Sequence, residues 1–186
     1  MRPRTATALA ALALVLTGCT SVTARTDGPS ADDLVKAATQ VLTDECLQRQ
    51  GLAPPRPGQQ VTAVEQQQVS DALFGKGPAE MTLRLSTGYV VRAHTDGCLA
   101  AANERLYGDQ RLWFHSSVIV NNLRPEASHD GVTLAVVRAR HRAELTEWSR
   151  LRAHATEQAA SLLQEEQVQE RAQKPQHQPS RGTAQK

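Results

Sequence analysis

The N-terminal segment sets the conditions under which the rest of the chain must fold. Arg2 and Arg4 precede an uninterrupted run of apolar or small residues from Ala6 to Thr17. As a helix this run would reach only about 18 Å, whereas the hydrocarbon core of a bilayer is about 30 Å thick. Residues 1–18 are therefore predicted to be an export signal that does not span the membrane and takes no part in the fold.

The end of this signal, Leu16-Thr17-Gly18-Cys19, resembles the lipobox of bacterial lipoprotein signal peptides. The resemblance implies that the Cys19 thiol receives a diacylglyceryl group and that a peptidase cleaves between Gly18 and Cys19. Two acyl chains anchor a protein stably, whereas one chain binds only marginally. We therefore expect Cys19 to be the lipid-attachment residue, with membrane lipid as its partner, and the protein to be lipid-anchored on the extracytoplasmic face of the cell membrane. The alternative is an ordinary secretory signal with a chance cysteine near its end.

The charge balance argues against one class of function. The chain carries 21 Lys+Arg and 19 Asp+Glu, a net charge of +2. Cleavage of the signal would remove Arg2 and Arg4, so the mature chain is predicted to be close to neutral. Tight nucleic-acid binding needs clustered positive charge. We therefore expect no nucleic-acid partner.

The two remaining cysteines, Cys46 and Cys98, would lie in an oxidising space once Cys19 is lipidated, and this setting favours one disulfide. Closing a loop of about 53 residues would stabilise the fold by roughly 4 kcal/mol if the effect is entropic. Two alternatives are free buried cysteines and a metal pair with His94. A zinc site normally needs four clustered ligands, which this sequence does not show, so we predict no metal and no other cofactor.

Proline, glycine and small polar residues divide the rest of the chain into short segments. Residues 19–31 are predicted to form a flexible tether. A helix is expected to begin near Asp32 or Asp33 and to end near Gly51. A stiff proline-rich connector follows at 53–58, and residues 61–74 show a weak helical pattern.

The middle of the chain gives one strand signal and two helical segments. Apolar residues alternate with polar ones from Met81 to Leu85, and Thr87-Gly88 precedes a second apolar run, so a short β-hairpin is predicted over about 81–93. Residues 98–107 favour a helix that ends at Gly108. The segment 109–123 has helical spacing and would stop before Pro125, but its Val118-Ile119-Val120 run could instead form a strand, so both structures stay open.

The last element is predicted to be one long helix over about 132–168, from residues seven apart in the sequence: Leu134, His141, Trp148, Ala155 and Leu162. Its front half, 134–151, is expected to pack on the domain while the rear half projects. A rear half that binds a partner is the alternative. Residues 164–186 are rich in Gln, Lys and Pro and are predicted to be a disordered tail. The fold class is therefore mainly α, with a single globular domain over 32–163.

Several segments resemble a recurring pattern in small, poorly characterised exported lipoproteins of high-GC Gram-positive bacteria. They are Glu45-Cys46-Leu47 with Gly51, and Gly97-Cys98 followed by residues 104–109. A later Trp-Ser-x-Cys-Met element of those proteins is matched here by Trp148-Ser149 without the cysteine and methionine. The resemblance covers about 45–152. It strengthens the pairing of the two cysteines that are present, and it implies no particular reaction.

Candidate catalytic groups occur singly, outside the common hydrolase, zinc-protease and phosphate-binding motifs. His141, three residues before Glu144, could be a general base or a pH-sensitive contact, but a packed or partly exposed helix histidine is the simpler interpretation. Asp96 and Asp109, with His94 nearby, could supply an acid pair for hydrolysis. A turn and helix-capping role explains Asp96 without catalysis. We therefore predict no catalytic residue.

Five arginines lie within fifteen residues of the predicted last helix: Arg138, Arg140, Arg142, Arg150 and Arg152. Arg138 and Arg142 would share one helical edge and could dock anionic lipid headgroups or wall polymers. Interspersed glutamates favour a solvated, salt-bridged face instead.

Taken together, these features predict a membrane-anchored surface lipoprotein that is not an enzyme. We expect a non-catalytic binding or interaction module whose partner is an envelope protein or a wall polymer. The alternative is a small cell-envelope hydrolase or accessory enzyme whose active site is not legible in the sequence.

Overall fold

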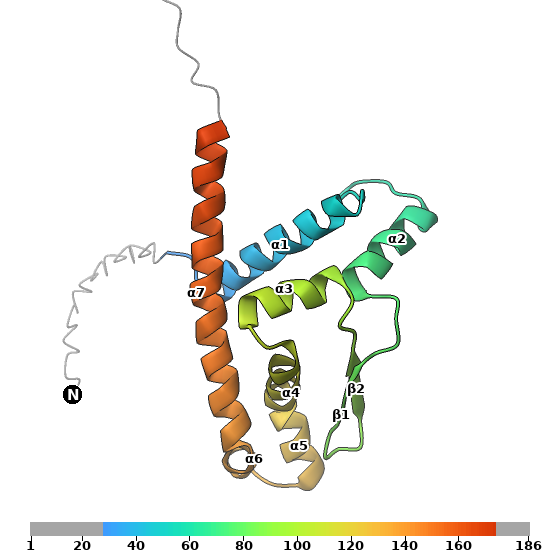
Figure 1. Ribbon diagram of the computed structural model, residues 1–186. Coiled ribbons are helices and arrows are strands. Elements are labelled where there is room, and N and C mark those ends of the chain that lie inside the picture. The colour runs from blue at the N-terminus through green and yellow to red at the C-terminus, as the bar shows by residue number, and fades with distance from the viewer. Residues whose placement is uncertain (1–27, 174–186) are drawn as a thin grey trace, which may run out of the picture.

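A computed structural model describes residues 28–173, in which helices predominate and one short hairpin interrupts them (Figure 1). The hairpin pairs β1 (Met81–Arg84) with β2 (Val90–Ala93) in antiparallel register, with Met81 opposite Ala93. The mainly α class and the hairpin predicted over 81–93 are confirmed. The helices are α1 (Ala31–Arg49), α2 (Ala63–Phe74), α3 (Cys98–Tyr107), α4 (Gln110–Asn121), α5 (Leu123–Asp130), α6 (Leu134–Arg140) and α7 (Arg142–Gln173).

Capping boxes fix where α1 and α2 begin. The Ser30 hydroxyl accepts a hydrogen bond from the Asp33 amide at 3.2 Å, and the Asp33 carboxylate accepts one from the Ser30 amide at 3.3 Å. Thr62 and Glu65 repeat the arrangement at the start of α2. Hydrogen bonds to the Asp33 carboxylate hold its pKa below the ordinary value; the bond from the Ser30 hydroxyl has the larger effect and the bond from the Ser30 amide the smaller. These reciprocal bonds satisfy backbone amides that have no partner within the first turn of a helix. They therefore stabilise the start of α2, whose apolar pattern is weak.

The segment left open between helix and strand is helical. Its N-cap is Asp109, whose carboxylate accepts a hydrogen bond from the Leu112 amide at 2.8 Å. As predicted, this helix stops before Pro125: α4 ends at Asn121, and a separate helix, α5, begins at Leu123 and holds the proline in its first turn. A proline is tolerated there since the amides of the first turn have no partner within the helix.

The prediction of one continuous helix over 132–168 is wrong at its front end. The chain leaves helical geometry at His141, so α6 and α7 are separate helices, and α6 lies across the base of α7 (Figure 1). At this break the His141 ring lies 3.0 Å from a carboxylate oxygen of Glu126 on α5. The spacing of apolar residues, from which the helix was predicted, gives no information about this tertiary contact.

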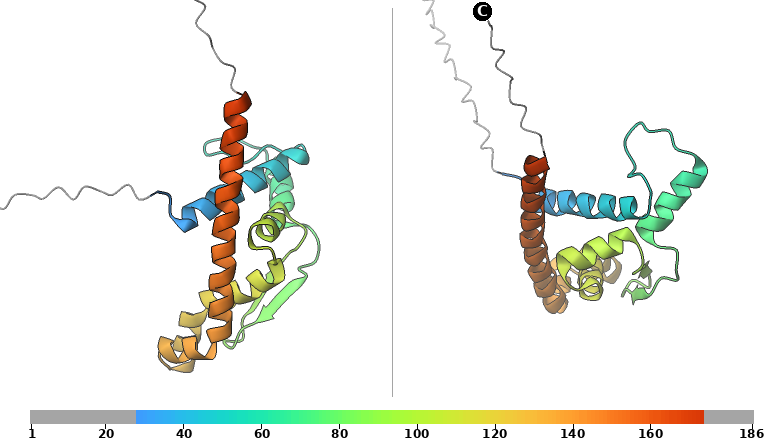
Figure 2. Two further views of the ribbon diagram at one scale, coloured as in Figure 1. Left: turned by 60° about the vertical axis from the view of Figure 1, so that its left-hand side comes forward. Right: turned by 45° about the horizontal axis from the view of Figure 1, so that its top comes forward.

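The middle of α7 forms the main core. Its buried residues are Leu151, Ala155 and Ala159, and they pack with Ala38 of α1 and Leu106 of α3. Figure 2 shows α1 crossing α7 at this level. Alanines let the helices approach closely, because their side chains end at Cβ. The expected packing of 134–151 agrees with the burial of Val137 and Leu151, but the packing continues to Ala159, so the expectation that the rear half projects is corrected.

The far end of α7 also differs from the prediction. The helix continues to Gln173, so residues 164–173 of the predicted disordered tail are helical and solvent-exposed. The predicted signal 1–18, Cys19, tether residues up to 27, and residues 174–186 lie outside the described residues. Within residues 28–173, no helix is both long and apolar enough to cross a membrane.

Candidate functional site

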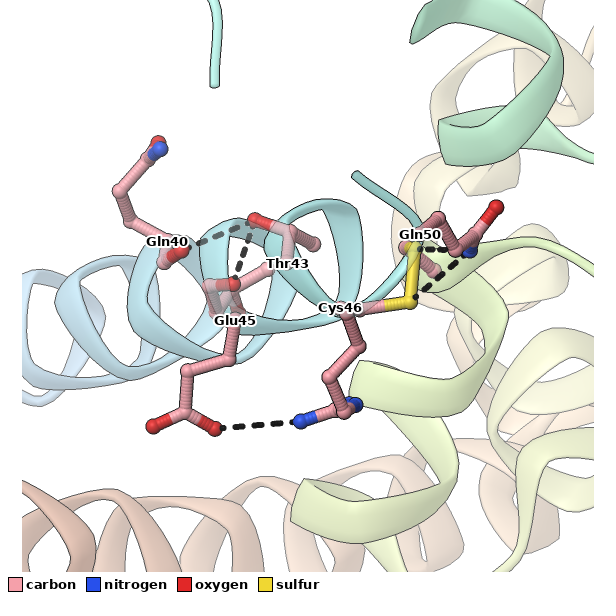
Figure 3. Close-up of a disulfide and its surroundings, with 8 residues drawn as sticks. Gln40, Thr43, Glu45, Cys46 and Gln50 are labelled. Atoms are coloured by element: carbon pink, nitrogen blue, oxygen red, sulfur yellow. Dashed lines mark hydrogen bonds and ion pairs between the residues drawn. A yellow bond between two sulfur atoms is a disulfide. The ribbon is translucent and has the colours of Figure 1, made fainter. Parts of the chain in front are cut away.

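The predicted disulfide between Cys46 and Cys98 is present and joins the last turn of α1 to the first residue of α3, with a Cα–Cα distance of 5.7 Å. Figure 3 shows the bridge beside Gln50, whose side-chain amide lies 3.6 Å from the Cys46 sulfur and 3.3 Å from the Cys98 sulfur. Both sulfurs are committed to this bond, so the alternative of a Cys98–His94 metal pair does not hold. The loop that the bridge closes contains α2 and the hairpin.

The end of α2 meets the start of α3 in a close backbone contact. A Cβ at Gly97 would collide with the Leu73 carbonyl oxygen and lie 2.7 Å from the Gly75 nitrogen, so only glycine fits there. Next to it, one carboxylate oxygen of Asp96 accepts hydrogen bonds from the amides of Lys76 (3.1 Å) and Gly77 (3.0 Å). These bonds, that from Gly77 first, hold the pKa of Asp96 below its ordinary value.

The prediction that Asp96 caps a helix is therefore corrected. The N-cap of α3 is Gly97, which makes no side-chain cap, and Asp96 instead orders the loop that follows α2. Asp109 caps α4, as described above. The two acids predicted as an alternative hydrolytic pair thus bind backbone amides of two different elements.

A cleft of about 380 Å³ opens between the end of α2, the hairpin, α3 and α4. We call it the Phe74 cleft. Its polar lining comes from Arg92, His94, Asn103, Gln110 and Ser117. Its main apolar lining residues are Leu73, Phe74, Met81, Leu99, Trp113 and Phe114.

Aromatic side chains are concentrated in this cleft. The whole chain has two Trp, two Tyr and two Phe residues, and Phe74, Trp113 and Phe114 all line the cleft. Trp113 is held in place by stacking on Tyr107, with ring centroids 3.7 Å apart. Phe74 is 57% exposed. A large apolar side chain left in water beside an open cleft is typical of a binding surface.

A second hollow of about 440 Å³ lies on the other side of Phe74, between α1 and α2. We call it the α1–α2 groove. It shares Leu73, Phe74 and Leu99 with the Phe74 cleft and adds Val35 and Lys36 from α1. These three shared residues therefore form part of the wall of both hollows.

The two hollows lack negative charge. Of the residues that the structure describes, no Asp or Glu lines either hollow, whereas Arg92 lines the cleft and Lys36 lines the groove. Between residues 28 and 173, no carboxylate forms an ion pair with Arg92. This electrostatic environment favours an anionic occupant.

His94 lies at the wall of the cleft. Its Nδ1 atom is buried, lies 3.7 Å from a carboxylate oxygen of Asp96, and has no hydrogen-bond partner among the described residues. Its backbone carbonyl accepts a hydrogen bond from the Gln110 side chain at 3.3 Å. Within residues 28–173, no three His, Cys, Asp or Glu side chains cluster in a way that could hold a metal ion.

His141 belongs to a polar network at the break between α6 and α7. Its Nε2 atom contacts the buried Glu126, and its Nδ1 atom lies 3.7 Å from Glu144. Arg140 lies 3.6 Å from Glu126 and 2.6 Å from Asp130. Hydrogen bonds to the Asp130 carboxylate, the one from His129 with the largest effect and the one from Arg140 next, hold its pKa below the ordinary value. His141 is therefore a helix-end residue with polar partners, in place of the predicted histidine on an apolar stripe.

The arginines near α7 mostly pair with acids. Arg150 binds Glu147, while Arg152 binds Asp32 of α1 and lies over the Trp148 ring at 4.7 Å. Arg138 and Arg142 fall on opposite sides of the helix break, so they do not share a helical edge. The arrangement fits the salt-bridged face that was the simpler interpretation.

The cleft could not be predicted from the sequence because its aromatic residues come from separate elements. Phe74 ends α2, and the adjacent Trp113 and Phe114 lie in α4. An available signal was the scarcity of aromatic residues, which makes a Trp-Phe pair and a phenylalanine directly before Gly75 noticeable.

Comparisons of the chain with protein-family models, with curated proteins and with solved structures give no match.

Proposed function

We propose that the chain is a lipid-anchored binding protein of the cell envelope. The acylated Cys19 holds it to the membrane, and the domain captures a partner in the Phe74 cleft without catalysing a reaction. The lipobox-like segment supports the anchor. The cleft supports binding, because open apolar hollows with a few polar groups are the usual form of ligand sites.

The exposure of Phe74 carries the binding proposal. This side chain lies between two hollows, both of which it lines, while more than half of its surface faces solvent. A partner that covers the ring would gain the free energy of removing its apolar surface from water. An apolar ligand, or an apolar segment of an envelope protein, fits this surface better than a fully polar wall polymer.

One observation favours the alternative of an envelope hydrolase. The unpartnered Nδ1 atom of His94 belongs to a residue that lines the cleft, where an imidazole could act as a general base. Turnover of ester or amide substrates that is lost in His94→Gln, with partner capture unchanged, would support the enzyme over the binding module.

The anchor is tested by fractionating cells that express the intact chain or Cys19→Ala. We expect the intact chain in the membrane fraction and the variant in the medium or soluble fraction. Mass spectrometry of the intact product should show a diacylglyceryl-modified Cys19 at its N-terminus. Membrane retention of Cys19→Ala, or an unmodified N-terminus, would contradict the anchor.

Binding at the cleft is tested on intact cells with a photo-crosslinking amino acid at position 74. The matched control carries it at position 64, because Val64 is also exposed on α2 but lines neither hollow. We expect a specific crosslinked product from position 74 that position 64 does not give. Identical products from both positions would contradict binding in the cleft.

A further inference from the structure

We propose that the Phe74 cleft binds a long-chain carboxylate, a single-chain amphiphile whose hydrocarbon chain packs on Phe74 and Trp113 and whose carboxylate pairs with Arg92. The inference rests on the proposed binding function and names the chemical class of its ligand. It combines three observations: the apolar lining, the lone cation at its edge, and a second hollow that shares three of its lining residues.

The lining selects a hydrocarbon. Phe74, Trp113 and Phe114 present aromatic surface, and Leu73, Met81 and Leu99 complete the apolar part of the lining. Two of its polar side chains already have partners within the fold: Ser117 donates to the Phe114 carbonyl at 3.2 Å, and Gln110 donates to the His94 carbonyl. Few polar groups thus remain to hydrogen-bond along a ligand, which disfavours a sugar or another ligand with many hydroxyl groups.

Arg92 selects the head group. Arg92 is an exposed residue of β2, is among the residues that line the cleft, and has no ion-pair partner among the described residues, as shown above. A guanidinium group can bind a carboxylate through two parallel hydrogen bonds. A cationic head group would meet Arg92 with no carboxylate from the described lining to offset the repulsion. The cleft is therefore expected to discriminate by the sign of the head group.

The second hollow selects a long, flexible chain. The Phe74 cleft and the α1–α2 groove share Leu73, Phe74 and Leu99, so a chain that begins at Arg92 can bend past Phe74 and continue along α1. Val35 and the aliphatic part of Lys36 would cover its far end. Each hollow is within the size range of a small-molecule site, whereas a bound protein segment usually covers a larger surface.

The test titrates dodecanoate, below its micelle concentration, into the mature chain from residue 19 carrying Cys19→Ala and Trp148→Phe, with the disulfide intact. Trp113 is then the only tryptophan and reports on the cleft. We expect saturable binding with one dodecanoate per chain by calorimetry, together with a change in Trp113 fluorescence. Dodecyltrimethylammonium, which has the same chain and a positive head group, should bind at least about tenfold more weakly, which corresponds to about 1.4 kcal/mol.

Matched variants separate the head-group contact from general effects on folding. Arg92→Gln should weaken dodecanoate at least about tenfold and remove the preference for the anion, which a merely structural role would not do. Arg84→Gln is the control, because Arg84 is an exposed arginine of the paired strand and lines neither hollow. Phe74→Ala should weaken both amphiphiles alike, and Val64→Ala should change neither. Circular dichroism checks that each variant is folded.

Three results would overturn the inference: no saturable dodecanoate binding, equal affinity for the two amphiphiles, or an anion preference that survives in Arg92→Gln. Binding to phosphatidylglycerol vesicles that needs Phe74, without binding of monomeric dodecanoate, would indicate membrane docking instead. A specific protein crosslink at position 74 without dodecanoate binding would leave the proposed function standing and refute this ligand class.

Discussion

The α1–α3–α7 region and the α2–hairpin region of this domain are built in opposite ways. In the first, side chains such as Leu106, Leu151 and Ala155 are almost fully buried where three helices meet. In the second, α2 has no buried residue anywhere along Ala63–Phe74, and the hairpin buries Met81 alone. Most of the exposed large hydrophobic residues described in 28–173 also lie in the second region or just before it: Val61, Val64, Phe74, Tyr89 and Val90.

This difference explains where the disulfide lies. The bridge closes the loop between residues 46 and 98, which is the stretch that contains α2 and the hairpin. A segment that buries little apolar surface gains little from the hydrophobic effect, and a covalent loop compensates by restricting the unfolded chain. The α1–α3–α7 region supplies a packed scaffold, and the α2–hairpin region supplies the exposed apolar surface on which we place binding.

Among the changes that test this comparison, removing the disulfide should have the largest effect on the free energy of unfolding. We expect Cys46→Ala/Cys98→Ala to lower the free energy of unfolding by about 4 kcal/mol, because a loop of this length loses that much restriction in the unfolded chain. Urea denaturation measures the loss. Hydrogen exchange should show that amides of α2 and the hairpin lose more protection than those of α7, and an equal loss in both regions would contradict the proposed division.

Truncating one core residue should have the second largest effect on the free energy of unfolding. Leu151 is 1% exposed, whereas Val64 is 67% exposed. Leu151→Ala should cost about 3 kcal/mol in the free energy of unfolding, from lost burial and the cavity left behind. Val64→Ala, the matched truncation on α2, should cost less than about 0.5 kcal/mol. Comparable losses in urea denaturation would show that α2 contributes to the core after all.

The sequence predicted the parts of this fold that depend on local chemistry. The hairpin over 81–93 followed from alternating residues, and the end of α3 followed from Gly108, which has a φ of 76° that suits glycine. Both signals lie within a few residues of the feature that they predict.

The parts that the sequence did not predict depend on distant contacts. The break at His141 coincides with its contact to Glu126, and the cleft takes its aromatic lining from Phe74 and Trp113 on separate helices. The packing of α7 beyond residue 151 was missed for a related reason. A stripe containing alanines looks weak in sequence, although Ala155 and Ala159 are fully buried where α1, α3 and α7 pack together.

The contact that joins the two regions can be tested at Gly97. This residue has a φ of −93°, so an alanine would not strain its backbone, but the new Cβ would collide with the backbone of residues 73–75. We expect Gly97→Ala to cost about 2 kcal/mol, as overpacking does elsewhere. Gly28→Ala, where a Cβ meets no atom within 4 Å, is the control and should be nearly neutral. A neutral Gly97→Ala would mean that α2 can move away from α3 freely, and the contact would then not hold the regions together.

The smallest effect should come from the carboxylate beside that contact, and it should depend on pH. The pKa of Asp96 is held below its ordinary value in the folded protein, chiefly by the amides of Gly77 and Lys76. Its stabilising contribution is therefore fully present above about pH 4, the ordinary aspartate pKa, and is lost as the pH falls through the folded value. Asp96→Ala should lower the thermal midpoint at pH 7, and the difference from the unmutated chain should shrink below pH 4. Asp96→Asn keeps an acceptor for both amides, so its smaller deficit should vary less with pH. A deficit of Asp96→Ala that stays constant from pH 7 to pH 3 would show that these backbone bonds do not depend on the charge, and that the link between the regions is steric alone.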